Sequence, residues 1–465
     1  MNDQAEAAPF QPLAELRRRQ TRLIPGTHEK PFLETPARFQ AAASPADIRA
    51  SQVKQMVVIP PPKRNPPVID LAELIGDAEV NEIETAGQFV FHAVGDTGNP
   101  KHTDLTEVAS VMSRDYYRSN PADRPALFLH LGDVCYNMYD DATNQVIPAP
   151  KSGMYQTQFY TPYADYPGKI IAIPGNHDSN PQEDPQSLAT FELNFCADLP
   201  ANAAAVDALI GSHAREPMYQ PGVYYLLDAP FAQIIALFSN GGETAGAIRD
   251  HDGAVRTADG TPIGEQQWQF LLNQLTQIQQ ARTANPAQRK ALILAVHHPP
   301  FSGGGGHSGS SEMLADLDAA FAQAQIVPDV VLSGHAHNYQ RFTRTVPAPG
   351  GGSLEVPYLV AGNGGHGITN LKNQPDGTRV ATPVPGADSE TVGTHSLQQY
   401  FNGFGHLLVT ITTRIVTVDL IGTHTHSQTP VDSVTVDLRT RQITHETPSF
   451  SHPALGEKEQ YRAPA

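Results

Sequence analysis

Five short segments of this chain carry side chains that metal centres use, and each directly follows an apolar run. Carboxylate, amide and phenol oxygens together with imidazole nitrogens suit Fe, Mn or Zn, and no thiolate is needed. One shared carboxylate can bridge two ions about 3.5–4 Å apart, the separation that clamps an in-line displacement at phosphorus. Each segment alone is a weak signal, but the set predicts a dinuclear metal site. In chain order the segments hold Asp96 in GDTG, Asp133 and Tyr136 in GDVCYN, Asn176 and His177 in GNHD, His297 and His298 in HHPP, and His335 and His337 in GHAH.

The apolar runs before these segments are short, rich in Val, Ile, Leu and Phe, and free of strict alternation, which is typical of strands buried on both faces. Helical patterns lie between them, the clearest at 263–282 and 313–325. Strands that alternate with helices predict an α/β fold, and a sheet that gathers its strand ends at one edge would bring the five segments together. The runs cover residues 88–96, 126–133, 169–178, 231–242, 291–300 and 329–337.

Later segments at 357–367, 404–422 and 432–440 predict further strands. Their alternation suits a second sheet with one wetter face. The first of these segments ends in GNGGHG, which lacks a P-loop Lys and a following helix. It therefore favours a strand-to-loop turn over a nucleotide cradle.

The composition excludes several classes of protein. The chain has 465 residues, of which 40% are hydrophobic, enough for a large core and for one large or several ordinary domains. Its formal net charge of −17 argues against a nucleic-acid or anionic-membrane surface, which needs clustered Lys and Arg. A small anionic substrate stays compatible with this charge, because bound cations can dominate the local field.

Cysteine content and the chain start bear on the cellular compartment. Cys135 and Cys196 are the two cysteines, which excludes a disulfide framework and a Cys-based zinc module. No run approaches the roughly 20 apolar residues needed to span a bilayer. The first residues lack the apolar core of a Sec signal peptide. These features indicate a cytoplasmic protein, and export by another route stays open.

In their order and residue types, the five segments resemble the motifs of the calcineurin-like metallophosphoesterase superfamily and, within it, of the purple acid phosphatases. The resemblance covers about residues 86–425. It implies an α/β fold, a four-layer α/β/β/α sandwich with a dinuclear site at the carboxyl ends of the strands. The expected organisation is an N-terminal extension at 1–85, Pro-rich and partly extended, a catalytic domain at 86–440 and a polar C-terminal tail at 441–465.

One position departs from the superfamily's common Asp-x-His pattern, because Gly98 stands where a metal-binding histidine would be. Tyr136 resembles the tyrosine with which purple acid phosphatases bind the first metal instead. A phenolate is a hard anionic donor, so the resemblance implies Fe(III) at that position; the alternative is a tyrosine that only packs. The implied ligands are Asp96, Tyr136 and His337 at the first ion, Asp133 as the bridge, and Asn176, His297 and His335 at the second ion, which would be Fe(II), Zn(II) or Mn(II).

Further histidines near these segments could take part in the reaction. The family's pattern of ligand, one residue and proline fits His297 with Pro299, and leaves His298 as its neighbour. The resemblance implies that His177 faces the phosphate. His307 follows a glycine run that departs from the family's usual loop, so a substrate-facing role and a solvated loop histidine are both open.

The activity implied by the resemblance is hydrolysis of a phosphate monoester, as in an acid phosphatase. A metal-bound hydroxide would attack phosphorus in line, and His177 or His307 would protonate the leaving alcohol. A phosphodiesterase on the same fold is one alternative, and a non-catalytic binding protein on a phosphatase scaffold is another. The expected partner is a small phosphorylated substrate, with neither nucleic acid nor a membrane, and the oligomeric state is open.

Other residues with reactive or aromatic side chains are interpreted as parts of the core. Cys135 is expected to be a buried, inert thiol. Trp268 falls on the apolar face of the helix at 263–282. His92 and His130 lie inside predicted strands, where packing is the simplest role.

Overall fold

The fold was obtained as a computed structural model, in which the described residues belong to the unit Glu34–Ala465. The sequence predictions for residues before 53 and after 447 lie outside the described part of the chain. The described residues are 53–100, 104–117, 121–138, 147–197, 215–242, 245–250, 253, 255–303, 307, 309–348, 351–369, 371, 394–423 and 429–447.

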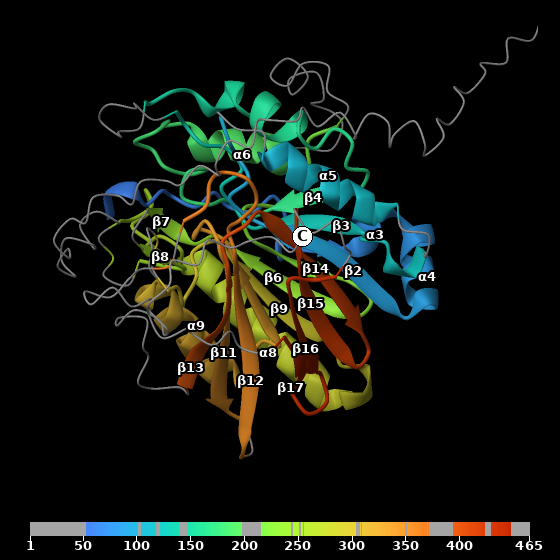
Figure 1. Cartoon of the computed structure of the whole chain (residues 1–465). Helices are drawn as coiled ribbons and strands as arrows, with labels where there is room; N and C mark the ends of the chain where they lie inside the picture. Colours follow the sequence, from blue (N-terminus) through green and yellow to red (C-terminus); the bar gives the residue numbers. More distant parts are fainter. Residues whose placement is uncertain are drawn as a thin grey trace, which may run out of the picture. The chain divides into compact units, whose positions relative to one another are not determined.

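The first three metal-site segments follow strands of a seven-stranded sheet (Figure 1). Its strands β2, β3 and β4 are parallel neighbours, so their carboxyl ends lie at one edge of the sheet. The remaining strands form an antiparallel meander that joins at β2 through β14. In spatial order the strands are β17 (Gln442–Glu446), β16 (Asp432–Asp437), β15 (Ile415–Gly422), β14 (Gly405–Thr412), β2 (Gln88–Val94), β3 (Leu127–His130) and β4 (Lys169–Ala172).

The last two metal-site segments follow strands of a separate eight-stranded sheet (Figure 1). Here β6, β9, β10 and β12 are successive parallel neighbours, and β11 and β13 add an antiparallel edge. In spatial order the strands are β1 (Val68–Asp70), β5 (Tyr225–Asp228), β6 (Ala232–Leu237), β9 (Ala291–Val296), β10 (Val330–Ser333), β12 (Ser353–Ala361), β11 (Tyr339–Pro347) and β13 (Thr394–Phe401). A two-stranded hairpin consists of β7 (Asn240–Gly242) and β8 (Ala245–Ala247).

Helices connect the strands, and both helices predicted most clearly from the sequence are confirmed. The pattern at 263–282 forms α8, and Trp268 is buried in it as predicted. The pattern at 313–325 forms α9, whose N-cap Ser310 accepts a hydrogen bond from the Met313 backbone N–H. The elements are α3 (Leu71–Ile75), α4 (Asp77–Ala86), α5 (Asp104–Tyr116), α6 (Ser187–Phe195), α8 (Glu265–Ala284) and α9 (Ser311–Ala324), with short turns η1 (Pro121–Asp123), η2 (Lys151–Gly153), η3 (Gln156–Tyr160) and η4 (Pro286–Gln288).

Strand β2 shows how the seven-stranded sheet uses its two faces. Phe89 and Phe91 belong to the large apolar core, which contains residues of both sheets. Val90, between them in sequence, instead packs with Val111 of α5 in a small separate cluster. Successive side chains of a strand point to opposite faces, so α5 covers the face of this sheet opposite to Phe89 and Phe91. The predicted α/β fold class is confirmed.

Two details of the strand prediction differ from the structure. The sequence suggested one sheet for all five segments and a second sheet for the later strands, but β2–β4 and β9–β10 lie in different sheets, and the later strands are shared between both. The run at 404–422 is also a hairpin, β14 and β15, rather than one strand. Strands buried on both faces lack alternation, so their sequences carry little information about which neighbour they pair with.

Two strands lie beyond the limits predicted for the catalytic domain. β1 precedes residue 86 and pairs in parallel with β5. β17 follows residue 440 and pairs with β16. The predicted domain limits themselves stay predictions. Within the described residues, no helix has the length and apolar character to cross a membrane.

Candidate metal centre

The predicted ligands lie on loops at the carboxyl ends of β2, β3, β4, β9 and β10, so both sheets contribute to one site. The loop after β2 touches the other sheet directly, because the Gly95 backbone N–H donates to the Ala361 carbonyl over 2.9 Å. The Asp96 N–H donates to the Gly132 carbonyl, also over 2.9 Å, which ties the loops after β2 and β3 together. The strand ends of two sheets therefore meet where the sequence predicted one sheet edge.

The two other predicted first-metal ligands and the predicted bridge converge on the phenol oxygen of Tyr136. This oxygen lies 3.0 Å from Asp96 Oδ1 and 3.2 Å from His337 Nε2. It also lies 3.0 Å from Asp133 Oδ2. All four side chains are buried. Their donor atoms thus lie close together in the buried part of the site.

The predicted second-metal ligands form an adjoining cluster around the amide oxygen of Asn176. Asn176 Oδ1 lies 3.0 Å from His297 Nε2 and 2.9 Å from His335 Nδ1. His297 Nε2 is in turn 3.2 Å from Asp133 Oδ2, the oxygen that also faces Tyr136. Asp133 therefore stands between the two clusters, as a bridging carboxylate would.

The backbone at Gly98 explains why no histidine can stand there. A Cβ atom at this position would lie 2.8 Å from Gln158 Oε1 and 2.9 Å from the Cα of Cys135, with the Val134 carbonyl closer still. These distances leave no room for a side chain. The loop after β3 occupies the space, and the same loop carries Tyr136 to the Asp96 carboxylate.

Three of the predicted ligands have backbone conformations that L-residues rarely adopt. The φ angle is 57° at Asp96, 56° at Asp133 and 70° at His335. Such conformations cost on the order of 1–3 kcal/mol each and cluster at functional sites. The surrounding fold therefore holds these three residues in backbone conformations that they would otherwise rarely adopt.

Of the two adjacent histidines, the geometry favours His297 as the ligand. Its Nδ1 lies 2.8 Å from the Leu131 carbonyl, which leaves Nε2 facing Asn176 and Asp133. Both ring nitrogens of His298 face other groups. Nδ1 is 2.8 Å from Ser239 Oγ, and Nε2 is 2.9 Å from the Gly242 carbonyl. His298 thus packs behind the centre.

His177 is held from both its backbone and its ring. Its backbone N–H donates to Asp133 Oδ1 over 2.8 Å, and its Nδ1 lies 2.6 Å from Glu183 Oε1. The other oxygen of Glu183 lies 2.8 Å from Lys151 Nζ, which is buried. Glu183 and Lys151 were not predicted from the sequence, because neither lies within a recognisable motif.

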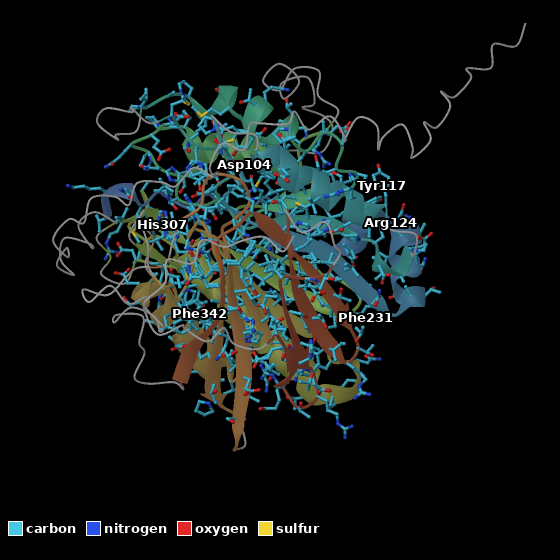
Figure 2. The ribbon with its side chains drawn as sticks, viewed as in Figure 1. Asp104, Tyr117, Arg124, Phe231, His307 and Phe342 are labelled. Carbon is cyan, nitrogen blue, oxygen red and sulfur yellow. The ribbon has the colours of Figure 1, made fainter. Side chains whose placement is uncertain are left out.

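His307, labelled in Figure 2, lies on the loop between β9 and α9. Its ring centre is 4.5 Å from that of His335 and 4.8 Å from that of His337. The side chain is buried rather than solvated. His307 therefore adjoins one predicted ligand of each cluster.

His366, in the GNGGHG segment, is a site residue that the sequence analysis missed. Its ring stacks on the Tyr136 ring with centres 3.5 Å apart and planes 16° apart. Its Nδ1 lies 2.7 Å from the Gly98 carbonyl, which fixes the ring. The only sequence signal was a histidine in a glycine-rich loop after a strand, and a turn explained that loop equally well.

Electrostatic coupling within the site keeps the central carboxylate charged. Burial opposes ionisation of Asp133, but His297 and His177 outweigh burial and hold its pKa well below the usual range. Burial likewise lowers the pKa of His297, but Asp133 outweighs it and raises that pKa to about 9. Burial and the surrounding histidines hold the pKa of His335 well below its usual range. A cluster of this kind favours a bound cation.

Cys135 does not take part in this cluster. Burial, aided by the Asp178 carboxylate, raises the pKa of its thiol well above the usual value. A thiol in such surroundings stays protonated and is a poor ligand. The prediction of an inert thiol agrees with this environment.

The donor set fits two first-row metal ions. It combines two carboxylates, a phenol, an amide oxygen and three imidazoles, all buried. Oxygen and imidazole donors of this kind bind Fe, Zn and Mn. The ligand atoms of Asp133, His297 and His335 all lie within 4.8 Å of one another. The Tyr136 oxygen lies 3.0 Å from Asp133 Oδ2, and His297 Nε2 lies 3.2 Å from the same oxygen.

Comparison with known proteins finds similar solved structures at low sequence identity. No curated protein matches the chain. Among solved structures, PhoD is 13% identical, with 84% of this chain and 74% of that chain covered and a TM-score of 0.48. A dimetal phosphatase from Danio rerio is 11% identical, with 72% and 96% covered and a TM-score of 0.37. GAP50, the anchor in the inner membrane complex of Plasmodium, is 11% identical, with 78% and 88% covered and a TM-score of 0.45.

A family comparison covers the site itself. The model of the calcineurin-like phosphoesterase family matches residues 89–339, more than half of the chain. The matched range contains all seven predicted metal ligands, together with His177 and His307. The chain therefore belongs to the calcineurin-like phosphoesterase family and is a metal-dependent phosphoesterase.

Proposed function

We propose that the chain is a phosphomonoesterase of the purple acid phosphatase type. The ligands of the first ion, Fe(III), are Asp96, Tyr136 and His337. Asp133 is the bridge. Asn176, His297 and His335 hold the second ion, which is Fe(II), Zn(II) or Mn(II). When bound, the two ions would activate a water molecule and neutralise charge on the phosphoryl group.

The observation that carries this proposal is the position of the Tyr136 phenol oxygen. It lies 3.0 Å from an oxygen of Asp96 and 3.0 Å from an oxygen of Asp133. The histidine of the common Asp-x-His pattern has no room at Gly98. A buried tyrosine that only packed would not need its oxygen among two carboxylates and an imidazole. The position of the phenol therefore supports the proposal that Tyr136 binds the first metal in place of the histidine that is absent at Gly98.

The residues beside the two clusters support a division of roles in the reaction. Glu183 fixes His177 at its Nδ1, and we assign its imidazole to the phosphoryl oxygens. His307 lies against both His335 and His337, on the side of the site formed by the loop after β9. One of these two imidazoles gives a proton to the leaving alcohol.

The proposed substrate is a small phosphorylated molecule. The net charge of −17 disfavours nucleic acid as a partner, because no excess of basic residues is present to neutralise a phosphate backbone. The ligand atoms themselves are almost completely buried. A terminal phosphate group, which can enter such a site end-on, suits this burial better than an internal diester.

The test is turnover of p-nitrophenyl phosphate against bis-p-nitrophenyl phosphate, with Fe and Zn or Mn supplied. We expect kcat/KM for the monoester to exceed that for the diester by about tenfold or more. A higher kcat/KM for the diester would identify a phosphodiesterase instead. Failure to hydrolyse either compound with both metal positions filled would favour a binding protein on this scaffold.

A further inference from the structure

A second group of histidine and aspartate side chains lies outside the five motifs. It consists of His92 on β2, His406 on β14 and Asp115 in the last turn of α5. β2 and β14 are antiparallel neighbours, and the two histidines project from them toward α5. All three side chains are buried. The sequence had suggested only packing for His92.

The three side chains present their donor atoms to a common point. Asp115 Oδ2 lies 2.9 Å from His406 Nε2 and 3.4 Å from His92 Nε2. The three ligand atoms all lie within 4.8 Å of one another. In a tetrahedral zinc site, bonds of about 2.0–2.1 Å place neighbouring ligand atoms roughly 3.3 Å apart. The His92–Asp115 separation lies close to this value, whereas the shorter His406–Asp115 separation is that of a direct hydrogen bond, which a bound ion would replace.

The surroundings of His92 match those of a metal-bound histidine. Its other ring nitrogen, Nδ1, lies 3.1 Å from the hydroxyl oxygen of Tyr166, which is itself buried. Metal-binding histidines almost always use the second nitrogen in such a contact, which fixes the tautomer and the ring orientation. The rings of His92 and His406 meet edge to face, with centres 4.8 Å apart and an interplanar angle of 85°. This arrangement keeps both Nε2 atoms on the Asp115 side.

The carboxylate also stands where a helix disfavours negative charge. Asp115 lies in the last turn of α5, at the negative end of the helix dipole. A buried anion at this end of a helix is stabilised by a nearby positive charge. A divalent cation supplies that charge without requiring either imidazole to be protonated.

We propose that His92, Asp115 and His406 bind a structural zinc ion, separate from the catalytic pair. Two imidazole nitrogens and a carboxylate oxygen suit zinc and disfavour magnesium or calcium, which take oxygen ligands. The three protein ligands leave the fourth tetrahedral position of the ion to a water molecule, and the burial of all three suits an ion that stabilises the fold. The ion ties α5 to β2, the strand whose end carries Asp96.

Metal stoichiometry tests this proposal. With zinc supplied, the wild-type chain should hold about three equivalents, and His406→Gln should hold about one fewer. The phosphoesterase activity of the variant should stay within about twofold of wild type, because the catalytic ligands are untouched. His445→Gln, at an exposed position on β17, is the matched control and should hold as many equivalents as wild type. Equal zinc content in wild type and His406→Gln would overturn the proposal.

A second measurement needs no variant, in case His406→Gln does not fold. Crystals of the zinc-loaded wild-type chain, measured at the zinc absorption edge, should show an anomalous peak about 2.0–2.2 Å from His92 Nε2, His406 Nε2 and Asp115. Peaks at the catalytic centre without one at these three residues would show a hydrogen-bonded core network instead. This result does not depend on the monoesterase proposal, because the catalytic peaks are read separately.

Discussion

The two buried clusters of histidine and aspartate are held by different kinds of backbone. In the catalytic cluster the donors stand on loops, and three of them, Asp96, Asp133 and His335, have positive φ angles. In the other cluster, His92 and His406 stand on paired strands and Asp115 on a helix. Loops with unusual backbone angles can bring metal-binding side chains from two sheets to one substrate site. Regular strands and helices instead hold side chains that link a sheet to the helix packed on it.

This difference separates the expected effects of mutation. Substitution in the catalytic cluster should abolish catalysis while most of the fold persists, because its loops lie at strand ends. Substitution of His92, Asp115 or His406 should lower the free energy of unfolding while phosphoesterase activity is retained. Each prediction below tests one side of that separation.

The largest effect is expected at the shared carboxylate. Asp133→Asn keeps the size of the side chain but removes the charge that faces both clusters. We expect kcat/KM to fall by about 10³-fold or more, with loss of bound metal and little change in melting temperature. Asp165→Asn, at an exposed position, is the control. Retention of a tenth or more of the wild-type kcat/KM would contradict the bridging role.

Asp115→Asn is the matching change in the other cluster. It leaves a buried site without its anion, so the free energy of unfolding should fall by about 3–5 kcal/mol, measured by urea denaturation. The kcat/KM of the folded enzyme should stay within about twofold of wild type. A large loss of activity with unchanged stability would remove the distinction between the clusters.

The carboxyl group of Asp115 makes the stability difference between wild type and Asp115→Asn depend on pH. The pKa of Asp115 is lowered on folding, so its contribution to stability is complete above the unfolded carboxyl pKa of about 3.9 and is lost as pH falls toward the folded value. In the metal-free protein, the difference in unfolding free energy between wild type and Asp115→Asn should therefore shrink below about pH 4. A difference that grew on acidification would contradict this sign.

Substitutions of the two adjacent histidines test which of them binds the metal in the loop after β9. His297→Ala should lose one metal equivalent and lower kcat/KM by about 10²-fold, because its Nε2 faces Asn176 and Asp133. His298→Ala should keep both catalytic ions and lose about 1–2 kcal/mol of stability, because it removes the contacts with Ser239 and Gly242. Metal analysis and urea denaturation measure both effects. The reverse pattern would move the ligand assignment by one residue.

The effect expected at Gly98 falls on stability and metal retention rather than directly on catalysis. Gly98→Ala adds one methyl group against the loop that carries Tyr136, and we expect a loss of about 1–3 kcal/mol of stability with weaker retention of the first metal. Gly153→Ala is the control, because a Cβ there meets nothing within 4 Å. Equal stability of the two variants would show that the loop can move aside, and that Gly98 does not exclude a side chain.

Much of this site could be predicted from the sequence, because its donors follow apolar runs directly. The order of GDTG, GDVCYN, GNHD, HHPP and GHAH was enough to indicate the family, which the family match confirms. The sequence did not show that two sheets supply the strand ends, because the buried strands carry no pairing signal. The positions of the helices α8 and α9 did follow from their apolar periodicity.

The supporting residues could not be predicted, since their roles depend on contacts between distant segments. His366 stacks on Tyr136 from a loop more than two hundred positions away in the chain. Lys151 and Glu183 meet only because η2 and the loop after β4 fold together. No sequence feature marked Asp115 or His406 either, because neither follows a strand end or lies in a motif.

The most direct test of the account is the visible absorption of the native protein and of Tyr136→Phe. A phenolate bound to Fe(III) gives a charge-transfer band in the visible, so the iron-loaded wild-type protein should be pink to purple. Tyr136→Phe removes one oxygen atom and leaves the stacking against His366 in place, so the change reports ligation rather than packing. We predict that the variant loses the colour and retains the first metal more weakly. A colourless wild-type protein, free of iron, fully active with two divalent ions and indifferent to Tyr136→Phe, would contradict the purple acid phosphatase assignment.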